Sequence, residues 1–328
     1  MNVISLFSGA GGLDLGFLQA GFNIILANEF DKTIWPTYEL NFKTPLIKGD
    51  LRKISPKAFP KCDGIIGGPP CQSWSEAGNS KGINDPRGRL FFEYIKIINQ
   101  IKPLFFVIEN VPGITAKKHI TSFNAIKYSL EKSGYALHIK ILNAVDYKVP
   151  QTRKRLFIIG FQKALDIPFE FPKPFSTKLT LKNAIWDLRI NATPSHDNKP
   201  KTSQNIIPNH EYLITSYSTQ YLSRNRVRSW DEPSFTIPAS ARHVPQHPQA
   251  PKMIKIDQDK FIFNPKYIHL YRRLSVRECA RIQTFPDNFY FKYSKISDGY
   301  KMVGNAVPPK LSYAIASQII KAFKAKHK

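Results

Sequence analysis

Five short apolar segments in the first 110 residues each lead into residues that can do chemistry. These are a glycine-rich turn at 8–12, three carboxylates and a cysteine: Glu29, Asp50, Glu109 and Cys71. In an open parallel sheet, ligands bind outside the carboxyl ends of the strands, so these residues are expected to surround one site. A glycine turn followed by acidic strand ends suits an adenosine cofactor, and a thiol suits nucleophilic catalysis.

Cys71 follows Pro69 and Pro70, which fix the backbone φ and remove two amide donors where the strand ends. Because a free thiol titrates near about 8.5, a thiolate nucleophile needs positive charge nearby. Arg153 and Arg155 can supply this charge, and they reach the same edge only if their strand runs antiparallel to the others. The alternative is a buried, inert cysteine.

The other two cysteines, Cys62 and Cys279, fit the inert alternative better than Cys71 does. The three cysteines are irregularly spaced, which predicts free thiols and no metal site.

Glu109 ends an apolar strand, and it is either a structural carboxylate that caps the next turn or an acid whose pKa is raised by burial near Cys71. The turn at 8–12 lacks the GxGxxG spacing and a P-loop lysine. An acidic lining favours a cationic, phosphate-free cofactor such as S-adenosylmethionine.

The elements that position these residues predict a doubly wound α/β fold. The expected strands alternate with amphipathic segments: "VISLF", "NIILA", "PLIKG", "DGIIGG" and "PLFFVIEN". We also expect a crossover helix between Asp85 and Pro103, a helix that begins with a capping box at Ser275 and Glu278, and a closing helix over "LSYAIASQIIKAF". Residues 162–270 are rich in proline and loop-forming residues, which predicts a smaller, loop-rich domain.

The charge of the chain points to nucleic acid. The net charge is +24, with +6 up to residue 150 and +18 beyond it, as expected for a protein that binds a polyanion. No apolar run approaches the roughly 18 residues of a membrane span, and no secretory leader pattern follows Met1. A cytoplasmic protein without membrane contact is expected.

The motifs together resemble the DNA (cytosine-5)-methyltransferases over nearly the whole chain. They appear in that family's order: "FSGAGG", "NEFD", "GPPCQSWS", "DPRGRLFFEY", "ENV", "QTRKRLFIIG", "RRLSVRECARIQTFPDNF" and "GYKMVGNAVPP". The resemblance implies a Rossmann-like catalytic domain over 1–175 plus 295–328. It also implies a target-recognition domain and hinge over 176–294.

The same resemblance assigns roles to individual residues. S-adenosylmethionine, with S-adenosylhomocysteine as product, is expected at a set of fourteen residues: Phe7, Ser8, Gly9, Ala10, Gly11, Gly12, Glu29, Phe30, Asp50, Leu51, Pro69, Asn305, Ala306 and Val307. Cys71 is expected to attack C6 of a flipped-out cytosine, while Glu109 binds N3 and Arg155 lies near O2. Arg153 is placed with them in the catalytic set, and the base that removes the C5 proton is not identified.

Double-stranded DNA is the expected partner. Arg224, Arg226 and Arg228 alternate at strand spacing, so one face of a strand or ribbon would carry all three towards guanines; phosphate contacts are the alternative. This stretch resembles that of the GGCC-modifying, HaeIII-type methyltransferases, which adds Arg242 and Ser218 to the expected DNA contacts. Ser73 and Ser75 are also among the expected DNA contacts.

The implied role is that of the modification enzyme of a restriction-modification system. A monomer is expected, with a cognate endonuclease in the same cell and no stable complex. A tRNA cytosine methyltransferase with the same catalytic motifs and a non-catalytic DNA-binding protein are the alternatives. A nicotinamide oxidoreductase fits less well because the glycine spacing differs.

Overall fold

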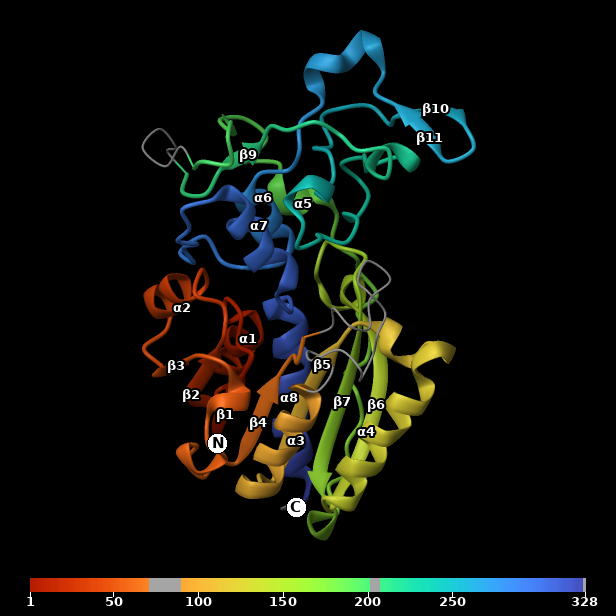
Figure 1. The fold of residues 1–328 in the computed structure, drawn as a ribbon. Helices are drawn as coiled ribbons and strands as arrows, with labels where there is room; N and C mark the ends of the chain where they lie inside the picture. The colour runs from red at the N-terminus through yellow and green to blue at the C-terminus, as the bar shows by residue number, and fades with distance from the viewer. Residues whose placement is uncertain (71–89, 201–206, 327–328) are drawn as a thin grey trace.

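The lower half of the protein in Figure 1 is built on one twisted sheet. We describe a computed structural model over residues 1–70, 90–200 and 207–326. Within these ranges the large sheet has seven strands in the order β3-β2-β1-β4-β5-β7-β6. Their bounds are β1 Asn2–Leu6, β2 Asn23–Glu29, β3 Leu46–Lys48, β4 Gly64–Gly67, β5 Phe105–Asn110, β6 Tyr135–Asn143 and β7 Lys154–Gln162.

The strand directions confirm the doubly wound α/β prediction. Strands β3, β2, β1, β4 and β5 are parallel, and β7 runs antiparallel to both β5 and β6. The five expected strands correspond in order to β1 to β5 of the structure. The antiparallel β7 carries the beginning of "TRKRLFIIG" to the edge where the parallel strands end. Arg155 therefore lies opposite Leu142 of β6, near the carboxyl end of β5.

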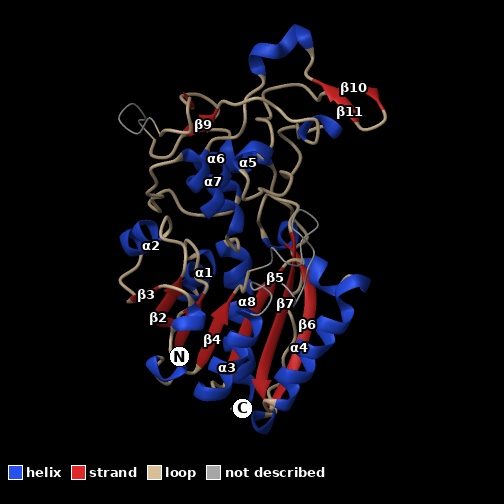
Figure 2. Cartoon of the chain, in the orientation of Figure 1, coloured by secondary structure: helices blue, strands red, loops and turns tan. Residues whose placement is uncertain are grey.

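Helices cover both faces of the sheet because neighbouring strand residues point to opposite sides. Val3, Phe105 and Val107 pack under α1 and α8, whereas their chain neighbours pack under α3 and α4: Ile4, Phe106 and Ile108. Figure 2 shows these layers around the red strands. The helices are α1 Gly12–Gln19, α2 Trp35–Asn41, α3 Leu90–Ile101, α4 Ile120–Lys132 and α8 Pro309–Lys326.

Two of these helices follow the sequence prediction. The expected crossover helix is α3, described from Leu90, and it ends where Lys102 takes a φ of 51° before Pro103. Its first expected residues, from Asp85, lie outside the described residues. The expected closing helix is α8, whose apolar side packs beside α1. In the described ranges, no helix combines the length and the apolar character that crossing a bilayer requires.

The region above the sheet in Figure 1 is loop-rich, as expected. Ser275 caps α6 and forms the predicted capping box with Glu278. The short elements here, within the described ranges, are α5 Leu181–Ile185, α6 Val276–Ile282, α7 Ile296–Asn305, β8 Thr193–Ser195, β9 Glu211–Leu213, β10 Ile254–Asp257 and β11 Lys260–Ile262.

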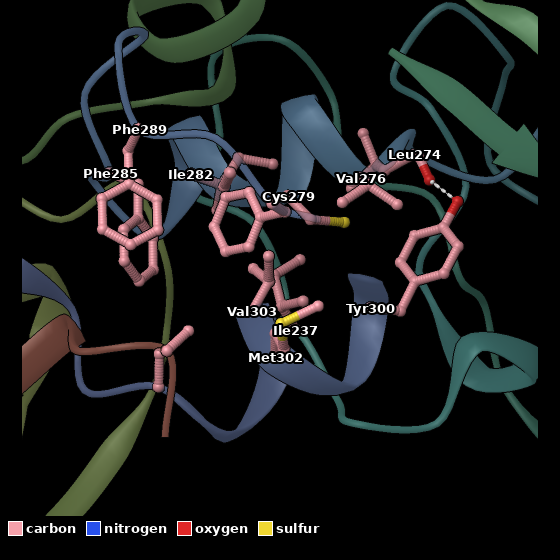
Figure 3. Close-up of a cluster of buried hydrophobic side chains, with 14 of the residues drawn as sticks. Ile237, Leu274, Val276, Cys279, Ile282, Phe285, Phe289, Tyr300, Met302 and Val303 are labelled. Carbon is pink, nitrogen blue, oxygen red and sulfur yellow. Dashed lines mark hydrogen bonds between the residues drawn. The ribbon is translucent and has the colours of Figure 1, made fainter. Parts of the chain in front are cut away.

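A hydrophobic cluster holds this upper region together (Figure 3). Cys279 of α6 is buried among apolar side chains of α6 and α7, and the Tyr300 hydroxyl donates a 2.7 Å hydrogen bond to the Leu274 carbonyl. The cluster also contains Ile237, Phe291, Ile296 and Tyr38 of α2. It therefore spans both sides of the expected boundary at residues 294 and 295, and the domain limits stay a prediction.

Candidate active site

One cavity of about 410 Å³ opens at the carboxyl ends of the parallel strands. Most residues of the expected cofactor and catalytic sets line it together: Phe7, Ser8, Gly9, Gly12, Glu29, Phe30, Asp50, Leu51, Pro69, Glu109, Arg155, Asn305, Ala306 and Val307. The ends of β1, β2, β4 and β5 thus meet the beginning of β7 and the end of α7. The predicted convergence of strand ends on one site is present.

The glycine turn at 8–12 forms one wall of the cavity. Gly9 and Gly11 have φ values of 56° and 83°, a left-handed conformation that glycine adopts without steric cost. A Cβ on Gly12 would lie 2.4 Å from the carbonyl oxygen of Val307, so α1 approaches the 305–307 segment as closely as backbones allow.

Ala10 and Gly11 do not line the cavity, although both were predicted to bind the cofactor. Ala10 is buried in the core, and a Cβ on Gly11 would lie 2.2 Å from the Phe42 ring. Both residues therefore face the packing side of the turn, and they shape it without facing the cavity.

Glu29 is held in place by two backbone amides. Its Oε2 accepts a 2.8 Å hydrogen bond from the Gly9 amide and its Oε1 a 2.7 Å bond from the Asp31 amide. Burial raises the pKa of Glu29, and these two hydrogen bonds oppose the shift. Each carboxylate oxygen has a second lone pair, so the group can still accept hydrogen bonds from a ligand.

Asp50 carries a charge that a neighbouring arginine balances. Its carboxylate caps the short 3-10 turn Leu51–Lys53 and forms an ion pair with Arg52, which holds the pKa of Asp50 below its usual value. Arg52 also lines the cavity and was not predicted. It follows directly after the predicted Asp50-Leu51 pair, but a basic residue after a strand end is too common to signal a site.

Phe30 lies at the mouth of the cavity with its side chain 63 % exposed. An exposed phenylalanine beside a cavity offers a flat face for stacking on an aromatic ligand. The next residue, Asp31, is tied to α7 by an ion pair of 2.8 Å with Lys301. Neither Asp31 nor Lys301 was predicted; Asp31 belongs to "NEFD", which was the available signal.

Glu109 and Arg155 form the charged pair inside the cavity. Glu109 is 9 % exposed, and its Oε1 lies 2.9 Å from the Arg155 Nε. Burial raises the pKa of Glu109, which agrees with the sequence expectation, although the charges of Arg155 and Arg153 act in the opposite direction. A Cβ on Gly68 would lie 3.0 Å from Glu109 Oε2, so the glycine leaves room for the carboxyl group.

The chain that leads to Cys71 is anchored beside this pair. The Asn110 side chain donates a 3.1 Å hydrogen bond to the Pro69 carbonyl, and Pro69 and Pro70 line the cavity. Cys71, Ser73 and Ser75 lie outside the described residues. Cys62 and Cys279 are free thiols, and burial raises the pKa of Cys62 to about 12 and that of Cys279 well above its usual value.

Arg153 does not line the cavity, although it was predicted with the catalytic set. Its side chain is fully buried and donates hydrogen bonds to three carbonyl oxygens, those of Ile237, Gly304 and Ala306. The strand β7 begins at Lys154. The period-2 alternation that would place Arg153 beside Arg155 therefore does not extend to residue 153.

The predicted arginine row is not carried by a regular strand, and in this respect the prediction is wrong. Arg224 is exposed, Arg226 is buried and Arg228 is intermediate, and only an isolated bridge at Val227 joins this stretch to a neighbour within the described residues. The Arg226 guanidinium donates to the carbonyls of Tyr221 and Gln220, at 2.7 and 2.8 Å. Because the carbonyls of this short turn need donors, Arg226 folds back on it.

The other expected DNA contacts have distinct surroundings. Arg228 forms an ion pair of 2.6 Å with Glu232, and the Ser218 hydroxyl accepts a 3.1 Å hydrogen bond from the Tyr221 amide. Arg242 is exposed on the short 3-10 helix Ala241–His243. Ser218 therefore stabilises the turn that Arg226 also caps.

The charges of several arginines act on His243. Burial lowers the pKa of His243, and four arginine charges lower it further: Arg226, Arg224, Arg273 and Arg242. Arg273 was not predicted; it is buried and lies over the Tyr217 ring, 4.1 Å from its centroid. Arg224, Arg226 and Arg242 thus all lie within electrostatic range of His243, while Arg228 pairs with Glu232.

The doubly wound sheet and its strand-end cavity define a Rossmann-like α/β protein with a ligand site at the carboxyl ends of its strands. The chain matches the family described as C-5 cytosine-specific DNA methylase over residues 1–321, and it belongs to that family. It is 57 % identical to the type II methyltransferase M.FnuDI of Fusobacterium nucleatum, covering 100 % of this chain and 96 % of the relative. It is 52 % identical to M.MthTI of Methanothermobacter thermautotrophicus, with 98 % and 97 % covered.

A solved structure agrees with this assignment. The fold is similar to that of a DNA modification methyltransferase encoded within an E. coli prophage, at a TM-score of 0.74 and 25 % identity, with 99 % of each chain covered. The protein is therefore an enzyme that methylates DNA cytosine at C5, with DNA as substrate and a methyl donor as co-substrate.

Proposed function

We propose that the enzyme transfers a methyl group from S-adenosylmethionine to C5 of a flipped-out cytosine, through a covalent bond between Cys71 and C6. The observation that carries this proposal is the buried Glu109–Arg155 pair, which shares one cavity with the glycine turn and with the two prolines that precede Cys71. A target base has to leave the duplex to reach such a pair, at a cost of a few kcal/mol.

The residues around the cavity fit S-adenosylmethionine. Glu29 can accept hydrogen bonds from the ribose hydroxyls, Phe30 can stack on the adenine, and Asp50 can accept a bond from the adenine amine. A Cβ on Gly9 would meet no protein atom within 4 Å, so this glycine leaves open space at the cavity wall. When bound, the sulfonium supplies an electrophilic methyl group, and S-adenosylhomocysteine is the product.

The protein's part in the reaction is to make cytosine C5 nucleophilic. The Cys71 thiolate forms a bond to C6 while the Glu109 carboxyl gives a proton to N3, so the ring's electrons become available at C5. C5 then takes the methyl group as the bond from sulfonium to methyl breaks. Loss of the C5 proton to a base, breakage of the S–C6 bond and return of the N3 proton to Glu109 restore the ring, the thiolate and the acid.

The raised pKa of Glu109 and the position of Arg155 support Glu109 as the acid. Burial raises its pKa, so a larger fraction of the carboxyl group keeps its proton near neutral pH. Arg155 is held by the ion pair with its guanidinium at the cavity wall, where it can bind the cytosine O2. Arg155 thus orients the base and the carboxyl group together.

We further propose that the target is the inner cytosine of GGCC. The resemblance to GGCC-modifying enzymes supports this, as do the exposed side chains of Arg224 and Arg242, because arginine pairs with the O6 and N7 of guanine. In this proposal the protein acts as a monomeric modification enzyme in the cytoplasm of a prokaryote. A cognate endonuclease recognises the same sequence without forming a stable complex.

Incorporation of 5-fluorocytosine tests the reaction and the target together. A duplex with this base at the inner position of GGCC is expected to form a covalent adduct with the wild-type enzyme at residue 71, in the presence of S-adenosylmethionine. Cys71→Ser is expected to bind both ligands and form no adduct. Absence of an adduct in the folded wild type refutes the covalent route. Methylation mapped to another sequence refutes GGCC, and transfer to tRNA in preference to duplex DNA supports the alternative substrate.

A further inference from the structure

Arg153 joins three segments that are far apart in the chain. Its Nη1 donates a 3.1 Å hydrogen bond to the Ile237 carbonyl, and its Nη2 donates bonds of 2.8 and 3.0 Å to the carbonyls of Gly304 and Ala306. The side chain is fully buried. A buried guanidinium is retained at this position only with hydrogen-bond partners, and here two segments supply them.

A second side chain makes a parallel bridge. The Gln151 Oε1 accepts a 2.9 Å hydrogen bond from the Ile237 amide, and its Nε2 donates to Gln283, at 2.9 Å. Gln283 in turn donates to the Val303 carbonyl, at 2.9 Å. Both backbone polar groups of Ile237 are therefore bound by side chains from the segment before β7.

The segments that Arg153 joins also touch directly. A Cβ on Gly304 would lie 2.3 Å from the carbonyl carbon of Pro238, so the backbone of 238–239 lies directly on the end of α7. Gly304 and Ala306 line the cavity, and Val307 contacts the glycine turn through Gly12. Movement of the 238–239 backbone toward α7 would therefore displace Gly304 and with it the cavity wall.

Ile237 also lies close in the chain to Arg242. Only three residues separate it from the short helix Ala241–His243, which carries Arg242. That helix packs against α7. A series of contacts thus runs from the short helix that carries the exposed Arg242 to the wall of the cavity, and Arg153 binds both ends of the 237–306 contact.

We propose that Arg153 is a positioning residue that sets the recognition segment and the methyl-donor cavity in one fixed arrangement. It does so by holding Ile237 on one side and Gly304 and Ala306 on the other. The proposal rests on the proposed donor and DNA target. It assigns Arg153 the role of joining two segments, in contrast to Arg155, which lines the cavity two residues later.

Steady-state kinetics on Arg153→Lys and Arg153→Met test this. The readouts are the KM for S-adenosylmethionine and the ratio of kcat/KM between the wild type's own target duplex and one with a single changed base pair. Arg153→Met is expected to raise the donor KM and lower the discrimination ratio by about 10-fold or more each, as displaced supporting groups commonly do. Lysine can still donate to part of the carbonyl set, so Arg153→Lys is expected to recover part of both losses.

Arg277→Met is the matched control. Arg277 is equally buried and donates to the carbonyls of Pro208 and Phe289, at 3.0 and 2.9 Å, within the recognition region. It is expected to lower the Tm while the donor KM and the discrimination ratio of the folded enzyme stay within about twofold. Equal losses in Arg277→Met, or unchanged values in Arg153→Met, overturn the proposal.

Gln283→Met covers the case in which the Arg153 variants do not fold. It breaks the parallel bridge and leaves Arg153 in place, so both readouts are expected to change in the same direction by about threefold or more. A change in neither readout overturns the proposal. A wild type that does not use S-adenosylmethionine, or methylates all sequences alike, contradicts the proposed function instead.

Discussion

Asp14 is a buried acid whose ionisation should reduce the stability of the fold near neutral pH. It lies in the first turn of α1 and is fully buried, with its two oxygens accepting hydrogen bonds from Ser5, at 2.6 Å, and Tyr38, at 2.7 Å. Burial raises its pKa from 3.8 to about 6, against both hydrogen bonds. The folded protein therefore binds this proton more tightly than the unfolded chain does.

The sign and size of the effect follow from these two pKa values. The stabilising contribution is fully present below the unfolded pKa near 3.8, and it is lost as the pH rises through about 6. The loss amounts to about 3 kcal/mol in total, of which about 2 kcal/mol falls between pH 4.5 and 7.5. Asp14→Asn cannot ionise and keeps one carbonyl acceptor, so the variant does not undergo this loss.

Urea unfolding of wild type and Asp14→Asn at pH 4.5, 6 and 7.5 measures the effect. The free energy of unfolding of the variant minus that of the wild type is expected to rise by about 2 kcal/mol across this range. Ionisable groups shared by both proteins cancel in this difference. Ser5→Ala removes a donor to the charged carboxylate, so its difference from wild type is expected to fall with pH. A flat profile for Asp14→Asn refutes the reasoning.

Three further changes test the cavity and the recognition arginines. Glu109→Gln is expected to slow single-turnover methyl transfer by about 10²- to 10⁴-fold because an amide cannot give up a proton, while both ligands bind within about threefold. Lys301→Met removes the ion pair to Asp31 and is expected to raise the donor KM by about fivefold at most, an effect that 0.5 M salt should abolish. Arg242→Ala is expected to lower discrimination for GGCC by about 10-fold or more, measured as the kcat/KM ratio; a uniform loss on all duplexes marks a phosphate contact instead.

The sequence predicted the sheet and its cavity well because continuous apolar runs and the residues that follow them are local signals. The chemical need for Arg155 near Cys71 implied that β7 runs antiparallel, and the pairing of β5 with β7 confirms this. Strand β6 was not predicted. It is an edge strand whose residues are mostly half-buried or exposed, so it lacks a continuous apolar run.

The recognition arginines show where local spacing fails. Alternation at 224, 226 and 228 predicts one exposed face only if the chain is a regular strand there, and the structure has a turn followed by an isolated bridge. The orientation of Arg226 is set by its hydrogen bonds to the carbonyl oxygens of Gln220 and Tyr221. Competition between a backbone acceptor and DNA for one guanidinium cannot be inferred from residue type.

Arg153 and Arg155 show that two residues of one motif can differ in role because of distant partners. They are identical in type and two positions apart, so the sequence assigns both to one edge of the sheet. Arg155 is inside β7 and faces Glu109, whereas Arg153 precedes the strand and faces Ile237, Gly304 and Ala306. Those partners lie roughly 80 to 150 residues further along the chain. Because only the packing of the upper region on α7 brings them to Arg153, its positioning role is a property of the tertiary structure rather than of the motif.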